Sequence, residues 1–135
     1  GGRRIKRSLY IDMNTIRFCT ADERKRFAEE GWISEKEKND SEVVNLHVFC
    51  QYIEHYLRKH PKVNTEMTLM VRQLQPQPEG LPVELYFFTT NKDWIPYERL
   101  QAQVFEHLLA VIGCFGLRIY QKPSGLDLER MQQSI

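Results

Sequence analysis

The apolar residues of this chain change their spacing several times, and that change constrains the fold more than any other feature. Apolar and polar residues alternate, as in a β-strand, over stretches 3–12, 67–72, 83–88 and 117–121. In stretches 43–60 and 93–112 the apolar residues instead recur three and four positions apart, as on one face of a helix. The predicted order is therefore β-α-β-β-α-β.

This order is that of the ferredoxin-like fold. We expect an α+β domain in which a four-stranded antiparallel sheet carries both helices on one face, with the first and third strands in the centre. The polar, turn-rich segment 75–80 (QPQPEG) predicts a hairpin between the second and third strands. Because many unrelated functions use this fold, the fold alone does not identify the function.

A length of 135 residues suits one domain, which we place at 1–123, followed by a polar carboxy-terminal tail at 124–135. An insertion of about residues 29–44 follows the first strand and a short charged helix. Within it, segment 34–42 (SEKEKNDSE) contains no apolar residue, which indicates a solvated or mobile segment.

The short charged helix has recognisable ends. Thr20 and Glu23 have the spacing of a capping box, which predicts the start of the helix at this point. Gly31 is a suitable residue for its end.

Charge and cysteine content narrow the class of protein. Nineteen Lys and Arg residues against 18 Asp and Glu residues give a net charge of +1, which provides no overall attraction to nucleic acid or anionic lipid. The 3 cysteines are widely spaced, which fits a reducing compartment better than a disulfide framework. No apolar run approaches the roughly 20 residues that span a bilayer.

The sequence predicts no enzyme, and no catalytic, cofactor-binding or metal site. The 4 histidines are not spaced with cysteines as zinc ligands are. Cys50 and Cys114 lie on or beside apolar helix faces, where cysteine usually packs as a small apolar residue. The glycines form no phosphate-binding loop.

The most informative surface is the face of the sheet opposite the helices. Strand alternation places on it a candidate contact face for another subunit or for the tail, made of Tyr10, Met70, Arg72, Tyr86, Phe88, Arg118 and Tyr120. An alternative is a stand-alone RNA-binding module that stacks bases on these aromatic rings, although the third strand, VELYFFT, lacks the RNA-recognition signature. A small-ligand-binding module on the same fold is also possible.

Several strings resemble small-conductance mechanosensitive ion channels, and in particular their mini-conductance subgroup. Residues 2–12 (GRRIKRSLYID) resemble the passage from the β domain into the α/β domain of these channels. Residues 67–76 (MTLMVRQLQP) and 80–89 (GLPVELYFFT) resemble the hairpin, and the match continues through 97–117. The similarity covers most of the chain and is weakest at 29–42 and after Pro123.

The resemblance implies a function that depends on a larger assembly. Channels of this family are ring-shaped homo-oligomers, heptameric in the prototype, that release ions and small osmolytes during hypo-osmotic shock. Their α/β domains form a vestibule on the cytoplasmic side of the bacterial inner membrane. We therefore expect other subunits of the same channel as partners, no nucleic acid, and membrane contact only through segments before Gly1.

The chain also departs from the family prototype. The 29–44 insertion is longer and more charged than a tight connection requires. Residues 125–130 (GLDLER) do not show the alternation of the strand with which prototypes close a small terminal barrel.

Overall fold

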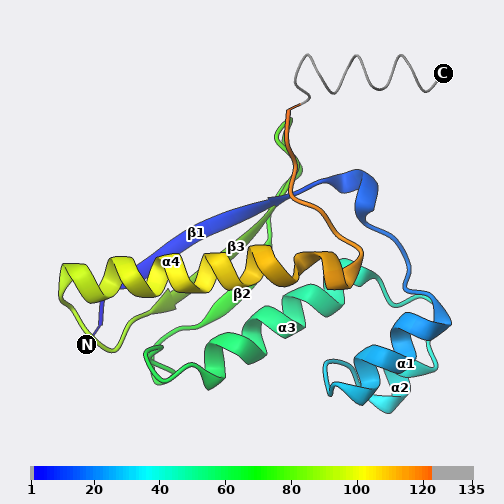
Figure 1. The fold of residues 1–135 in the computed structure, drawn as a ribbon, viewed down its shortest axis with the longest axis horizontal. Helices are drawn as coiled ribbons and strands as arrows, with labels where there is room; N and C mark the ends of the chain where they lie inside the picture. Colours follow the sequence, from blue (N-terminus) through cyan, green and yellow to red (C-terminus); the bar gives the residue numbers. More distant parts are fainter. Residues whose placement is uncertain (1, 123–135) are drawn as a thin grey trace.

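The computed structural model describes residues 2–122, so the tail predicted at 124–135 lies outside the described residues. Its helices and strands follow one another as β1 (Arg4–Ile11), η1 (Met13–Thr15), α1 (Ala21–Glu29), α2 (Glu35–Lys38), α3 (Asn45–Lys59), β2 (Met70–Gln73), β3 (Leu81–Phe88), α4 (Trp94–Val111) and η2 (Ile112–Phe115). Figure 1 shows α3 and α4 side by side across the sheet, with α1 and α2 beyond one end of it.

The sheet has three antiparallel strands in the order β1-β3-β2. The predicted four-stranded ferredoxin-like sheet is therefore wrong. The strands β2 and β3 do form the predicted hairpin, closed by hydrogen bonds between Gln77 and Gly80. Only β3 is central, because the outer edge of β1 from Arg4 to Ser8 has no strand partner within the described residues.

The segment predicted as the fourth strand, 117–121, makes a single antiparallel bridge to β1, between Ile11 and Ile119. On the Asp12 side of this bridge, strand pairing stops because β1 ends in a tight turn. The Asp12 carbonyl accepts hydrogen bonds from the Thr15 amide at 3.0 Å and the Thr15 hydroxyl at 2.6 Å. The Arg118 amide, which would extend a ladder to Asp12, donates to Thr15 Oγ1 instead.

Alternation along β1 and β3 explains which face the helices cover. The register pairs Ile5 with Phe87 and Leu9 with Val83, and these four side chains are buried. The helices α3 and α4 contribute the other half of this core, including Phe49, Ile53, Leu57, Val104 and Leu108. The predicted helical stretches thus have the apolar faces expected of them.

The predicted capping box of α1 is confirmed, since Thr20 and Glu23 exchange side chain-to-backbone hydrogen bonds. Gly31 follows the helix with φ of +80°, a left-handed conformation that suits glycine. The charged segment 34–42 contains a helix, α2, which begins with a second capping box between Ser34 and Glu37.

The buried amide of Asn45 joins three separate segments at the start of α3. Its Oδ1 accepts from the Arg17 amide at 3.0 Å, and its Nδ2 donates to the carbonyls of Thr15 at 3.0 Å and Phe115 at 2.9 Å. Asn45 is completely buried, and within the described residues every buried side-chain nitrogen or oxygen has a hydrogen-bond partner. The polar core residue therefore specifies how η1, α3 and η2 meet.

Candidate contact face on the sheet

The face of the sheet opposite α3 and α4 is formed by the even-numbered residues of its strands. The register places Lys6 opposite Tyr86, and Tyr86 opposite Met70 on the other side. None of the described helices packs on this face (Figure 1). We call this surface the open face.

The predicted contact residues all lie on the open face. Tyr10, Met70, Arg72, Tyr86 and Phe88 belong to strands whose alternate residues are in the core. Arg118 and Tyr120 flank Ile119, whose bridge partner Ile11 is on the helix side, so both point the other way. The structure thus brings these residues onto one surface.

Two aromatic rings form the centre of the open face. Tyr86 and Phe88 meet edge to face, with ring centroids 5.8 Å apart, and both are partly exposed. The Arg4 guanidinium lies 6.0 Å from the centroid of the Tyr86 ring, and Met70 stays 36% exposed beside them. The surface offers apolar area with cations at its rim, as protein interfaces often do.

An ion pair between the exposed Arg72 and the buried Glu84 limits how polar this face is. Glu84 is only 6% exposed, although it lies on the open face, and its carboxylate is 2.9 Å from the Arg72 guanidinium. Arg72 Nε donates a hydrogen bond to Glu84 Oε1 at 2.9 Å, and Arg72 Nη2 lies 2.9 Å from the same oxygen. Sequence analysis missed Glu84 as a member of the face, although its position two residues before Tyr86 in the alternating strand was the available signal.

At the Tyr10 end of the open face, the segment that follows η2 is hydrogen bonded to β1. The Tyr120 amide donates to the Tyr10 carbonyl at 2.9 Å, which places the two tyrosines side by side. Arg118 forms an ion pair of 3.2 Å with Asp12. Tyr10 remains 39% exposed, so this end also offers aromatic surface.

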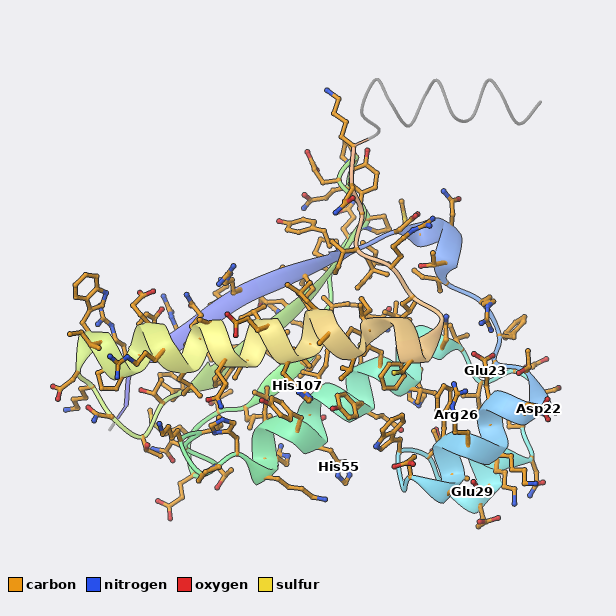
Figure 2. The ribbon with its side chains drawn as sticks, in the orientation of Figure 1. Asp22, Glu23, Arg26, Glu29, His55 and His107 are labelled. Atoms are coloured by element: carbon orange, nitrogen blue, oxygen red, sulfur yellow. The ribbon has the colours of Figure 1, made fainter. Side chains whose placement is uncertain are left out.

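A second group of polar aromatic side chains lies between α3 and α4. His107 of α4 points toward α3 (Figure 2), where its ring stacks on Tyr56 at 4.2 Å and its Nε2 is 2.5 Å from the Tyr52 hydroxyl. Burial lowers the pKa of His107 and raises the pKa values of Tyr52 and Tyr56. These shifts favour a neutral hydrogen-bonded cluster, whose evident role is to join α3 to α4.

Other titratable side chains lie on α1 and α3. Asp22, Glu23 and Glu29 lie on α1 (Figure 2), where Glu23 is held by Arg17 at 2.6 Å. Burial raises the pKa of the Cys50 thiol to about 11, which opposes its use as a nucleophile. Among residues 2–122, no three His, Cys, Asp or Glu side chains are placed to hold a metal ion together.

No helix in the described part of the chain is long and apolar enough to cross a membrane. A comparison of the sequence with models of known protein families found no match. The open face, with its partly exposed rings and no covering layer among the described elements, is therefore the best candidate for function.

Proposed function

We propose that this chain is the cytoplasmic α+β domain of a small-conductance-type mechanosensitive channel, in which it joins neighbouring subunits of a ring-shaped homo-oligomer. The observation that carries the proposal is the open face, where Tyr86, Phe88, Met70 and Tyr10 keep partly exposed apolar surface. Burying these side chains against another subunit would remove that surface from water, at roughly 25 cal/mol for each Å² of apolar area.

The distribution of the family resemblance supports the same proposal. The strings that resemble the channels lie in β1, in the β2–β3 hairpin and in α4, which together build the sheet and half of its helical cover. The region of weakest resemblance, 29–42, lies in α1, α2 and their connections, away from the open face (Figure 1). Three of the elements that resemble the family, the strands β1, β2 and β3, are thus those that present the contact surface.

The first experiment uses the complete reading frame from which this chain comes, expressed in bacteria that lack their own mechanosensitive channels. We expect protection against hypo-osmotic shock and tension-activated currents in membrane patches. Absence of tension-activated current from a correctly inserted protein would contradict the proposed function.

The role of the open face is tested in the same full-length protein. We expect Tyr86→Ser with Phe88→Ser to reduce the fraction of assembled oligomer on native gels. Phe18→Ser is the matched control, because Phe18 is 60% exposed but lies outside the sheet. Equal assembly of the double variant and the control would contradict a subunit contact at this face.

The RNA-binding alternative has a specific observation in its favour, because Arg4 and Lys6 border the exposed rings. Fluorescence anisotropy with a mixed-sequence single-stranded oligonucleotide at near-physiological salt separates the two functions. We expect only weak binding. Tight binding that loses about 1–3 kcal/mol for each ring removed would favour base stacking over subunit contact.

A further inference from the structure

An exposed apolar pair lies at the start of α4, far along the sequence from the amino terminus but next to it in space (Figure 1). Trp94 is 65% exposed and Ile95 is 59% exposed, and they are neighbours on the first turn of the helix. Single exposed apolar side chains are common on protein surfaces, but adjacent large ones form a contiguous apolar patch, which is more informative.

Basic residues from three segments lie at the same end of the molecule as this pair. Thr89 just before α4 exchanges hydrogen bonds of 2.9 and 3.0 Å with the Arg3 backbone, and the Arg3 guanidinium lies 4.5 Å from the Tyr97 ring centroid. The Thr90 amide donates to the Lys62 carbonyl at 3.0 Å, which brings the end of α3 to the same place. The exposed cations at this end are Arg3, Arg4, Lys62, Lys92 and Arg99.

The charge of this end is positive even after its carboxylates are included. Glu66, Asp93 and Glu98 lie in the same region, so five cations face three carboxylates. Glu98 also accepts a hydrogen bond of 3.3 Å from the Trp94 indole. The surplus of two positive charges here exceeds the net charge of +1 of the whole chain.

We propose that this basic and apolar corner, made of Trp94 and Ile95 with Arg3, Arg4, Lys62, Lys92 and Arg99, docks on the surface of an anionic lipid bilayer. Tryptophan favours the headgroup region because its ring is apolar and its indole N–H remains hydrogen bonded. Lysine and arginine beside it gain attraction from anionic headgroups. The hydrogen bonds to Thr89 and Thr90 fix the backbones of Arg3 and Lys62 beside the start of α4, so cations and apolar side chains can engage the same surface together. Of these residues only Arg4 also borders the open face, so the docking otherwise makes no use of the proposed contact between subunits.

The test measures binding of the chain to two kinds of vesicle, one of phosphatidylcholine alone and one in which about a third of the lipid is phosphatidylglycerol. We expect co-sedimentation with the anionic vesicles only, with weakening as salt is raised. Trp94 emission should shift to shorter wavelength on binding, and the shift should be absent in Trp94→Ser. Equal binding to both vesicles, or none to either, would overturn the proposal.

Two variants separate the apolar from the electrostatic contribution. Trp94→Ser with Ile95→Ser should lower the partition coefficient about tenfold or more, because the apolar area no longer enters the interface. Lys92→Gln should lower it about fivefold, the equivalent of one headgroup charge contact. Both sites are exposed, and circular dichroism verifies that the variants remain folded.

Matched controls make the result specific to the corner. Phe18→Ser with Leu109→Ser removes two other exposed apolar side chains, and Lys25→Gln removes an exposed cation on α1, at the other end of the molecule (Figure 1). These controls should bind as the unmodified chain does. Loss of binding in the controls, or full binding by the Trp94 and Ile95 double variant, would refute docking at this corner.

Discussion

Replacing Asn45 with alanine tests whether one buried amide holds the junction of η1, α3 and η2. The change removes three hydrogen bonds and leaves the Arg17 amide and the carbonyls of Thr15 and Phe115 without that partner. The bond to Phe115 is buried and the other two are partly buried. Counting about 2 kcal/mol for the buried group and about 1 kcal/mol for each of the others gives a loss of about 4 kcal/mol in the free energy of unfolding.

Urea denaturation followed by circular dichroism measures this loss. For a domain of this size, about 4 kcal/mol corresponds to a fall in Tm on the order of 10–20 °C. Asn64→Ala is the matched control, because Asn64 Oδ1 accepts one exposed hydrogen bond, from the Glu66 amide at 3.0 Å. The control should lose less than about 1 kcal/mol.

A charged variant adds a pH test to the same site. Asn45→Asp keeps the acceptor for Arg17 but places a second oxygen against the carbonyls of Thr15 and Phe115. Burial disfavours the carboxylate and raises its pKa in the folded state, so this variant should be less destabilised in acid than at neutral pH. If Asn45→Ala loses no more stability than Asn64→Ala, the amide does not hold the junction and the reasoning is refuted.

Three further results follow from local geometry. Gly80→Ala should lower the free energy of unfolding by about 1–3 kcal/mol, because Gly80 has φ of +105° and a Cβ there would lie 2.5 Å from the Ile11 carbonyl oxygen. Gly31→Ala, at φ of +80° with no neighbour within 4 Å, has the backbone strain without the clash, and thermal denaturation of both variants separates the two effects. At pH 8 an alkylating reagent should modify the exposed Cys114 well before Cys50, as followed by mass spectrometry, because the pKa of about 11 leaves only about one Cys50 thiol in a thousand ionised. Equal alkylation rates of the two cysteines in the folded protein would contradict the burial of the Cys50 thiol. The hydrogen bond from Arg17 lowers the pKa of Glu23 in the folded state below its ordinary 4.5, so the pair stabilises the fold above that pH and its contribution is lost as the pH falls through the lowered pKa. In Glu23→Gln the free energy of unfolding should therefore fall less steeply in acid, and an unchanged pH dependence would show that the pair contributes nothing.

Local patterns in the sequence predicted individual helices and strands, although not the sheet, because such elements depend mainly on nearby residues. The alternation around Val83 and the capping box at Thr20 correspond to β3 and α1. The alternation of 117–121 was equally suggestive, yet this segment meets β1 only at Ile11 and leaves the edge from Arg4 to Ser8 without a strand partner among the described residues. The turn at Asp12, whose carbonyl bonds to Thr15, ends the pairing beyond Ile11, and such a turn is not visible in apolar spacing.

The candidate site shows the same division. Alternation placed Tyr86 and Phe88 on the open face, since side-chain direction in a strand depends only on position. It did not indicate that Glu84 on that face is buried, because its burial depends on the Arg72 guanidinium from the neighbouring strand. Nor did it reveal that Arg3 lies beside Thr89 and Tyr97 at the start of α4, which requires knowing that β1 begins where α4 begins.

The outer edge of β1 from Arg4 to Ser8, which has no strand partner among residues 2–122, has a consequence for solubility at high concentration. An exposed strand edge invites the same strand of another molecule to pair with it, which is a common first step in aggregation. Two copies of β1 paired in this way would bring Arg4, Lys6 and Arg7 of one molecule near the same residues of the other. Repulsion between these like charges opposes the pairing, so the basic strand protects its own edge. Concentrated salt would weaken that protection, and the protein would then become more prone to form extended β-structure.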